Sequence, residues 1–489
     1  MHLSRRAVLA GAVSSLATTA FAQAPVTSMR PIARVPVNDA VTRLVANAGL
    51  KGTVGVYVVD LATGETIENI DAITAQPPAS VTKAFTALYA LDVLGSEYQF
   101  KTRLFADGVL KDGILDGNLI LAGGGDPELA TDDLFTLAQM LKESGLREVK
   151  GNFFVWDEAL RNADEIDSDQ LDHFGYNPTV TGLNLNYNRV HFEWKREDDD
   201  FTTTMDARSE NYRPVVTTSR INIVDRPDPV FTYRDVGNVD QWTVARPSLN
   251  DEGSRWLPVR KPGLYAGEVF AIFARSHGIV LKAPQETLAE PDGQVLASKE
   301  GAPLAQVMQG MLRYSTNLTA EVAGLTATNL RVGERRGMRT SAIGMARWMT
   351  KRCGGITPHF VDHSGLGDLS RVSPADMVKM LSSPAVMETL QPIMRDIRLV
   401  GDDDRIIDRD GISVRAKTGT LNFVSTLAGY VRTDKGRDLA FAIFASDLDA
   451  REAGKLEGSE QPRGARTFNT RARRLQQDIL KHLAQRLPA

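Results

Sequence analysis

The stretch from residue 75 to residue 95, AQPPASVTKAFTALYALDVLG, places a serine and a lysine at the head of a run that is otherwise almost wholly apolar. Pro77 and Pro78 suit the entry to a helix, and Gly95 suits its end. Ser80 and Lys83 are three residues apart and would share one face of that helix. The lysine is therefore either an ordinary surface residue at a helix start or a buried group that acts on the serine.

The size and composition of the chain narrow its class. Its 489 residues are too many for one ordinary core and predict two or three domains. Hydrophobic residues at 42% and charged residues at 24% are typical of a globular protein. A formal net charge of −4 argues against a nucleic-acid-binding protein, which would carry a basic stripe. The single cysteine, Cys353, cannot form an internal disulfide, and we interpret it as an inert buried thiol.

The N-terminal residues 1–22 predict a cleavable export signal. Arg5 and Arg6 precede a short stretch rich in Ala, Val and Leu, which ends in the small-residue site Ala20-Phe21-Ala22. The arginine pair also fits the twin-arginine route, although the usual aromatic residue is absent, so the general secretory route stays open. A membrane anchor is disfavoured because the apolar run is short and interrupted by Ser and Thr. We expect a periplasmic mature protein that begins near Gln23 and has no stable membrane span.

The pattern along the chain predicts one domain split by an insertion. Residues 52–70 suit two strands, and residues 131–146 suit an amphipathic helix. Helical periodicity returns at 264–279 and 302–327. Residues 413–433 and 437–446 suit two neighbouring strands, and residues 470–486 suit a closing helix. Between these ends, short strands and turns begin near Tyr98, and the segment from about Phe174 to Leu264 has short β-branched runs with many Pro, Asn and Asp residues. Since loop-closure entropy grows slowly with length, we expect residues 23–95 and 291–489 to form one domain, interrupted at 96–290 by one or two small domains. The acidic run at 197–200 is interpreted as a solvated loop.

Two further motifs follow the serine–lysine pair. Ser315-Thr316-Asn317 lies between two helical runs, and Lys417-Thr418-Gly419-Thr420 lies on a predicted strand. Each alone has an ordinary explanation, as a helix cap or a strand end, and roughly one Ser-x-x-Lys is expected by chance in a chain of this length. The order of the three motifs and their structural contexts favour one shared site.

Two other patterns suggest cofactor or metal sites and are disfavoured. The glycine-rich stretch at 122–128, AGGGDPE, lacks the Lys-Ser/Thr ending of a phosphate-binding loop and suits a tight turn. His359 and His363 are four residues apart, but not in a His-Glu-x-x-His pattern, so structural roles are favoured. The sequence therefore predicts neither a metal site nor a cofactor.

The three motifs resemble those of penicillin-binding proteins and serine β-lactamases. The finer resemblance is to class C low-molecular-mass penicillin-binding proteins, the D-alanyl-D-alanine carboxypeptidase/endopeptidase group. The stretches that carry it are LILAGGGDPEL (119–129), GLNLNYNRV (182–190), GLYAGEVF (263–270), STNLTAE (315–321), DHSGLGDLSRVSP (362–374) and AKTGTLNFVSTLAGYV (416–431). The long gap between Lys83 and Ser315 also resembles this group, whose members carry extra domains there, whereas β-lactamases are shorter.

Three features depart from the pattern of the group. Thr316 stands where Asp is usual, at a position that is not catalytic. Residues 362–368 differ from the usual Asp-Gly-Ser-Gly-Leu-Ser-Arg, so no role is carried over for that Ser-Arg pair. The tract at 451–465 looks like an extra polar loop.

The resemblance implies both a fold and an activity. The fold is an α/β (α+β) DD-peptidase/β-lactamase-like transpeptidase domain, with an antiparallel sheet flanked by helices and a β-rich insertion. The activity is hydrolysis of D-alanyl-D-alanine bonds in peptidoglycan stem peptides through an acyl-enzyme at Ser80, with covalent binding of β-lactam antibiotics such as penicillin. A serine β-lactamase or esterase of the same fold, and a scaffold without turnover, are the alternatives.

The chemistry of the motif residues supports a role for each. A serine hydroxyl needs a base, and burial favours the neutral form of Lys83 that can act as one. Ser315 can relay a proton to the leaving nitrogen, and Asn317 can bond the substrate amide. Lys417 offers positive charge to a terminal carboxylate.

The neighbours of Lys417 complete the predicted substrate site. The hydroxyls of Thr418 and Thr420 can donate to the same carboxylate, and Gly419 leaves room for a peptide to lie along the strand. By resemblance, the backbone N–H groups of Ser80 and Thr420 form the oxyanion hole.

Overall fold

The computed structural model describes residues 39–401, 406–407 and 411–486. The predicted export signal at 1–22 lies outside these residues.

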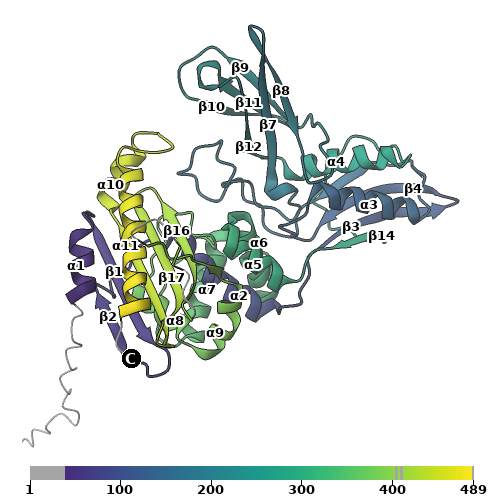
Figure 1. Cartoon of the computed structure of the whole chain (residues 1–489). Coiled ribbons are helices and arrows are strands. Elements are labelled where there is room, and N and C mark those ends of the chain that lie inside the picture. Colours follow the sequence, from purple (N-terminus) through teal and green to yellow (C-terminus); the bar gives the residue numbers. More distant parts are fainter. Residues whose placement is uncertain (1–38, 402–405, 408–410, 487–489) are drawn as a thin grey trace, which may run out of the picture. The chain divides into compact units, whose positions relative to one another are not determined.

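The two ends of the described chain share one six-stranded antiparallel sheet (Figure 1). In spatial order its strands are β15 (Arg395–Asp396), β16 (Ser413–Leu421), β17 (Val424–Arg432), β18 (Asp438–Ser446), β1 (Thr53–Asp60) and β2 (Thr66–Ile70). The predicted α/β fold class, with an antiparallel sheet flanked by helices, is confirmed. One expectation is wrong: the stretch 413–433 forms two strands rather than one, because the chain turns at Asn422 and Phe423. Phe423 has a φ of +61°, and no glycine marks the turn in the sequence.

Helices cover both faces of this sheet (Figure 1). On one face lie α1 (Asp39–Asn47) and α11 (Ala465–Arg486); on the other lie α2 (Thr82–Leu94), α5 (Leu304–Tyr314), α6 (Asn317–Val332), α7 (Met338–Arg352), α8 (Pro374–Leu381) and α9 (Pro384–Leu390). The central strand β17 is buried from Val424 to Val431 because that stretch carries no charged side chain.

The helix predicted after Ser80 is α2, and it ends before Gly95 as expected. Its residues Thr82–Ala90 are all buried, as expected for a helix that is apolar on every side. The helices α5, α6 and α7 surround it. This central position puts Lys83 inside the protein.

The segment between α2 and α5 has sheets of its own. A six-stranded mixed sheet contains β13 (Gln285–Glu286), β6 (Phe153–Trp156), β4 (Ile114–Gly123), β3 (Lys101–Lys111), β14 (Gln294–Glu300) and β5 (Glu148–Val149), with α3 (Thr131–Glu143) and α4 (Pro262–Ser276) packed beside it. Two three-stranded sheets follow the orders β10 (Phe231–Val236), β11 (Val239–Ala245), β9 (Ser219–Val224) and β12 (Glu252–Pro258), β7 (Arg189–Glu197), β8 (Asp200–Asp206). The acidic run at 197–200 is the exposed tip of the β7–β8 hairpin.

The division into a split domain and an insertion at 96–290 stays a prediction. One apolar cluster joins all three of these sheets with α3 and α4, from Leu104 to Ala297. The strand β14 pairs with β3, so it belongs to the sheet of the inserted segment although it lies beyond residue 290.

Short helices complete the chain. They are the 3₁₀ turns η1 (Ala79–Val81), η2 (Asn186–Asn188), η3 (Arg246–Ser248) and η4 (Gln391–Ile393), and the helix α10 (Leu448–Lys455). The tract at 451–465, predicted as a polar loop, therefore begins inside a helix. One contribution is local: the Asp447 carboxylate accepts a hydrogen bond from the Ala450 amide at 3.0 Å and caps α10.

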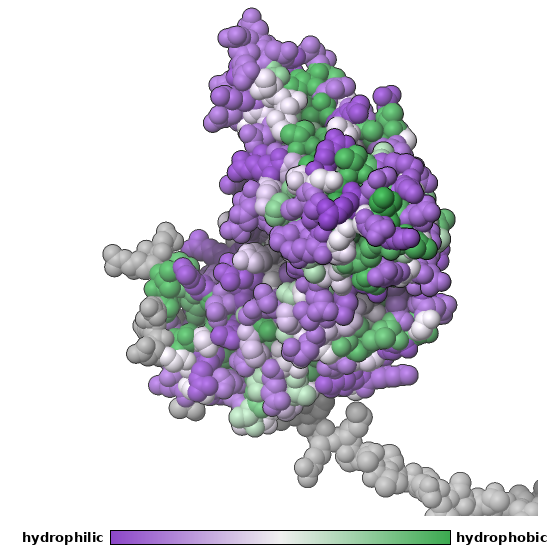
Figure 2. Space-filling view, turned by 90° about the vertical axis from the view of Figure 1, so that its right-hand side faces the viewer, coloured by the Kyte–Doolittle hydropathy of each residue, from purple (hydrophilic) through white to green (hydrophobic). Residues whose placement is uncertain are grey.

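Figure 2 shows one face of the molecule, where hydrophilic residues predominate and apolar residues gather in separate groups. In the described part of the chain, no helix combines the length and the apolar character that a membrane span needs.

Candidate active site

Ser80 lies in η1, directly before the buried helix α2. Ala79 before it has a φ of +47°, a conformation that is strained for a residue with a Cβ atom. A loop presses against this turn: a Cβ atom at Gly365, where φ is +75°, would lie 1.9 Å from the Ala79 carbonyl oxygen. Only glycine fits at 365, and its close approach helps to hold the turn that presents Ser80.

Lys83 is fully buried below Ser80. Its Nζ donates to Ser80 Oγ at 3.0 Å and to Asn317 Oδ1 at 2.7 Å. Its third contact is with the Ser364 carbonyl oxygen at 2.7 Å. Burial lowers the pKa of Lys83 from 10.5 to about 7, although Asp362 and Glu321 nearby act in the opposite direction. Much of Lys83 is therefore a neutral amine at neutral pH.

The three partners of Lys83 differ in what they can offer. The Asn317 Oδ1 atom and the Ser364 carbonyl oxygen only accept hydrogen bonds, whereas the Ser80 hydroxyl can also donate. A neutral amine has two N–H groups and one lone pair. When those two N–H groups bond the two obligate acceptors, the lone pair points at the Ser80 hydroxyl. The geometry thus suits removal of the serine proton.

Two buried carboxyl groups near Lys83 were not predicted from the sequence. Glu321 of α6 accepts from the amides of His363 and Ser364, and Asp362 accepts from the amides of Gly365 and Gly367. Burial raises the pKa of both carboxyl groups. Glu321 thus ties the 362–367 loop to α6, and Asp362 braces the loop from within. Both lie in stretches that carried the family resemblance, which is the one signal that could have pointed to them.

The second motif lies at the junction of two helices. Ser315 ends α5 in a left-handed conformation with φ +61°, and Asn317 begins α6. This sharp turn brings both side chains to the site: Asn317 reaches Lys83, and Ser315 Oγ lies 2.9 Å from the Nζ atom of Lys417.

The third motif lies on β16. Lys417 is buried, and its Nζ also donates to the Thr418 carbonyl oxygen at 2.6 Å. Burial lowers the pKa of Lys417 well below 10.5, and the charges of Lys83 and Arg395 act in the same direction.

The residues that follow Lys417 alternate as a strand requires. Thr418 and Thr420 are exposed and Gly419 is buried. A Cβ atom at Gly419 would lie 2.2 Å from Thr426 Oγ1 and 2.9 Å from the Ser80 amide nitrogen, so glycine lets the strand approach η1. The structure brings together all eight residues that the sequence predicted, from Ser80 to Thr420, and their chemical roles stay predictions.

A cleft of about 510 Å³ opens above these residues. Ser80, Ser315, Asn317 and Thr420 line its base. The inserted segment forms one wall, where the Tyr176 carbonyl oxygen accepts a hydrogen bond of 2.9 Å from Asn317 Nδ2. This wall was not predicted, because nothing in the sequence connects residues 141 positions apart.

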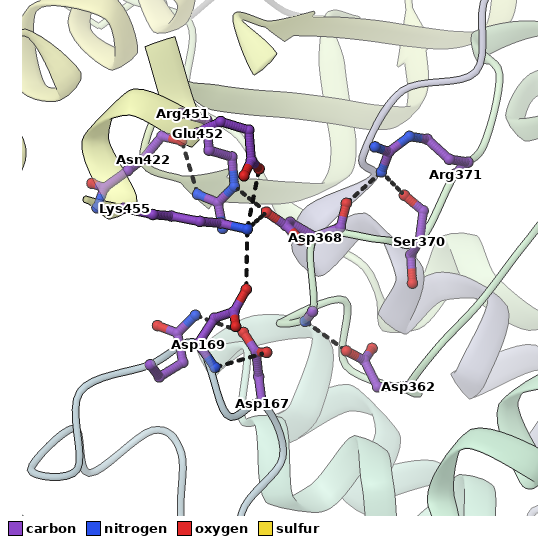
Figure 3. Close-up of polar contacts among 12 residues, drawn as sticks. Asp167, Asp169, Asp362, Asp368, Ser370, Arg371, Asn422, Arg451, Glu452 and Lys455 are labelled. Carbon is purple, nitrogen blue, oxygen red and sulfur yellow. Dashed lines mark hydrogen bonds and ion pairs between the residues drawn. The ribbon is translucent and has the colours of Figure 1, made fainter. Parts of the chain in front are cut away.

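The facing wall comes from α10 and the turn after it, and charged groups join the two walls (Figure 3). Lys455 Nζ lies 2.7 Å from Asp368 Oδ2 and 3.0 Å from Asp169 Oδ2. Arg451 Nε lies 2.8 Å from the same Asp368 oxygen. A second contact joins the same two walls: Glu460 Oε1 lies 2.6 Å from Nε2 of His173 in the inserted segment.

The histidine pair has surroundings that suit structural roles. His363 is buried with its Nε2 atom 2.8 Å from Ser341 Oγ, and burial lowers its pKa to about 3, so the ring is neutral. His359 is exposed. Within the residues that the structure describes, no group of three or more His, Cys, Asp or Glu side chains could hold a metal ion.

Comparison with known proteins finds a family model that matches most of the chain. Residues 37–461 match the model of the D-Ala-D-Ala carboxypeptidase 3 (S13) family. A relative, the D-alanyl-D-alanine carboxypeptidase of Actinomadura sp., is 25% identical over 95% of this chain and 93% of its own.

Solved structures share the fold. The crystal structure of penicillin binding protein 4 (dacB) from Haemophilus influenzae superposes with a TM-score of 0.72 at 22% identity, over 90% of this chain and 99% of that one. A second structure of that protein, complexed with a novel β-lactam, gives a TM-score of 0.68 at 20% identity, over 91% and 99%.

Proposed function

The chain belongs to the D-Ala-D-Ala carboxypeptidase 3 (S13) family and is a serine-type hydrolase, and from this premise we propose that it cleaves the D-alanyl-D-alanine bond of peptidoglycan stem peptides through an acyl-enzyme at Ser80. One observation carries the proposal: the Lys83 Nζ atom lies 3.0 Å from Ser80 Oγ, in surroundings that lower its pKa to about 7. A base poised near neutral pH is what a serine nucleophile requires.

In the proposed acylation step, Lys83 takes the Ser80 proton as Oγ attacks the carbonyl carbon of the penultimate D-alanine. The C–N bond then breaks, an ester forms at Ser80, and the proton passes through Ser315 to the leaving nitrogen. Water later hydrolyses the ester. Asn317 holds the Lys83 amine, and its amide also faces the cleft where the substrate amide would lie.

The leaving D-alanine ends in a carboxylate, and Lys417 is the proposed partner for it. Thr418 and Thr420 present exposed hydroxyls on the same strand. In the proposed arrangement, the substrate lies along the edge of β16 as an added strand. The backbone N–H groups of Ser80 and Thr420 would stabilise the oxyanion, a contribution of about 3 kcal/mol for each donor.

A labelled penicillin tests the acyl-enzyme. Intact-protein mass spectrometry followed by peptide mapping should find the label on the Ser80 peptide, released slowly, and Ser80→Ala should abolish it. An adduct on another residue would overturn the assignment of Ser80. Rapid release would instead support a serine β-lactamase.

We also propose that the protein acts in the periplasm, because residues 1–22 have the composition of an export signal. N-terminal sequencing of the protein from its native host should find a mature chain that begins at or near Gln23. Recovery of the full-length chain from the cytoplasm would contradict this. Replacement of Arg5 and Arg6 by Lys should impair export if the twin-arginine route is used.

A further inference from the structure

The orientation of the Asn317 amide decides which of its two ends faces Lys83. Its Oδ1 atom lies 2.7 Å from Lys83 Nζ, and its Nδ2 atom donates to the Tyr176 carbonyl oxygen at 2.9 Å. Lys83 alone does not fix this orientation, because a neutral amine can accept a hydrogen bond from an amide N–H as well as donate one to an amide oxygen. The Tyr176 carbonyl oxygen can only accept, so it requires the Nδ2 end. The inserted segment therefore selects the end of Asn317 that Lys83 meets.

The reversed orientation of the Asn317 amide would impair the base. An Nδ2–H group would then point at Lys83 Nζ and compete with the Ser80 hydroxyl for the lone pair of the amine. The ammonium form of Lys83 would lose an acceptor and face a donor instead, which favours the neutral form. Reversal would thus lower the Lys83 pKa and also reduce the fraction of neutral Lys83 whose lone pair faces Ser80.

The contact with Tyr176 leaves Asn317 able to bind a substrate. The Nδ2 atom carries two N–H groups, and the Tyr176 carbonyl oxygen takes one of them. Asn317 also lines the base of the cleft, where the second N–H group can meet the substrate amide. The orienting contact is therefore compatible with the role proposed for Asn317.

The Tyr176 carbonyl belongs to a loop, residues 164–177, that Arg260 holds from the side. The Arg260 side chain is 10% exposed and donates to three backbone carbonyl oxygens of this loop. They are those of Asp164 at 2.7 Å, Asn177 at 3.0 Å and Asp172 at 3.1 Å. The rigid, planar guanidinium group suits several acceptors at once. Since Asn177 directly follows Tyr176, Arg260 fixes the backbone beside the carbonyl that Asn317 contacts.

We propose that Arg260 is a positioning residue for catalysis: it holds the 164–177 loop so that the Tyr176 carbonyl orients Asn317, and Asn317 in turn orients Lys83 toward Ser80. The inserted segment then takes part in activating the nucleophile and does more than form a wall of the cleft. The inference rests on the proposed function, in which Lys83 takes the Ser80 proton.

The test is the rate of acyl-enzyme formation with a labelled penicillin, measured over a range of pH. In wild type this rate should rise with pH and level off once Lys83 has lost its proton. Arg260→Gln should lower the plateau by about tenfold, the equivalent of one lost hydrogen bond. It should also move the midpoint to lower pH by about half a unit or more, because the reversed amide favours the neutral amine.

A milder variant displaces the same loop without removing a charge. A Cβ atom at Gly175 would lie 2.8 Å from the Trp256 carbonyl oxygen, so Gly175→Ala should shift the residue before Tyr176. We expect the same two changes, in the same direction and smaller. This variant decides the question by its midpoint if Arg260→Gln does not fold.

Arg226→Gln is the matched control. Arg226 also belongs to the inserted segment and donates to a backbone carbonyl oxygen, that of Pro229 at 2.7 Å, but it does not line the cleft. Its replacement should lower the thermal unfolding temperature at most and leave both the plateau and the midpoint of acylation in place.

The midpoint is the readout that a merely structural role would not move. A lower plateau with an unmoved midpoint in the loop variants would mean that less of the protein is active, and would overturn the inference while the proposed function stands. An acylation profile that the loop variants leave unchanged would overturn it equally. If wild type forms no acyl-enzyme at Ser80, the proposed function fails, and the inference fails with it.

Discussion

The two buried lysines of the site occupy regions of opposite electrostatic character. Lys83, at the head of α2, has the carboxyl groups of Asp362 and Glu321 nearby. Lys417, on β16, has the cations Lys83 and Arg395 nearby instead. Burial lowers the pKa of both lysines, but neighbouring charge opposes this effect at Lys83 and adds to it at Lys417.

This difference suits two different tasks. The carboxyl groups limit how far burial lowers the Lys83 pKa and keep it near neutrality. At such a pKa the amine can both take and return a proton. The groups that shift the pKa of Lys417 do not include a carboxyl group. An arriving substrate carboxylate would supply one, and would raise the Lys417 pKa as it binds. The positive charge predicted for Lys417 would then be fullest when the anion is present.

The largest effect is expected at the Lys83 end. Ser80→Ala and Lys83→Ala should each lower kcat by at least about a thousandfold, because nucleophile and base act as one unit. The double variant should lose no more than the worse single variant. Peptide hydrolysis measured for all three checks this, with the exposed Lys111→Ala as control. If the activity of the double variant fell by the product of the two single losses, Lys83 would not act through Ser80. The role that the comparison assigns to Lys83 would then be wrong.

A smaller effect is expected at the Lys417 end, and it concerns substrate choice. Wild type should cleave a peptide with a free terminal carboxylate about ten- to a hundredfold faster in kcat/KM than its amide, the equivalent of a charge-assisted hydrogen bond. Lys417→Gln should reduce this ratio as well as the overall rate. The measurement is a four-way comparison of acid and amide peptides on wild type and variant. An acid-to-amide ratio that the substitution leaves unchanged would show that Lys417 does not recognise the carboxylate.

The sequence predicted the Lys83 region better than its surroundings, for a physical reason. The contact between Ser80 and Lys83 spans one helical turn, so spacing alone predicts it. Spacing did not predict Glu321 and Asp362, because no local pattern shows that a carboxyl group will be buried beside a lysine. The Tyr176 contact with Asn317 arises only from tertiary packing.

The Lys417 region shows the same limit on a larger scale. The sequence predicted that Lys417 to Thr420 lie on a strand and that the hydroxyls of Thr418 and Thr420 face the substrate carboxylate. The extra strand break at Asn422 and Phe423 had no glycine to mark it. The helix α10 has so many polar residues that the tract read as a loop, yet Asp368 on another part of the chain provides the partner for its Arg451.

The pH dependence of acylation tests whether the two regions are coupled. Lys83 acts as a base only when deprotonated, so kcat/KM should rise about tenfold per pH unit below its pKa and level off above about 7. The charge of Lys83 lowers the pKa of Lys417 by repulsion. A repulsion between two titrating groups acts on both, so we expect it to lower the pKa of Lys83 as well. Lys417→Gln removes it, so the Lys83 pKa should rise and the whole limb should move to higher pH. Full pH profiles of wild type and variant check this, and a limb that stays in place would show that the two lysines titrate independently.

The smallest effect is expected for Lys455, whose ion pairs lie at the exposed edge of the cleft and away from the two buried lysines. Lys455 is 28% exposed, and its partners Asp169 and Glu452 are more exposed still. Lys455→Gln should therefore lower the free energy of unfolding by less than about 1 kcal/mol. The better buried partner, Asp368, keeps its bond to Arg451 in the variant, so no buried carboxylate is left unpaired.

The ion pairs of Lys455 raise its pKa, so their contribution is complete at neutral pH and is lost only as the pH rises above the ordinary lysine range. The stability difference between wild type and Lys455→Gln should accordingly stay flat between pH 6 and pH 9 and shrink as salt is added. Denaturant unfolding at two salt concentrations measures it. A loss of several kcal/mol, or a fall in kcat/KM comparable to that of Lys417→Gln, would show that the cleft edge is coupled to the buried site. In that case the different electrostatic surroundings of Lys83 and Lys417 would not be enough to explain catalysis.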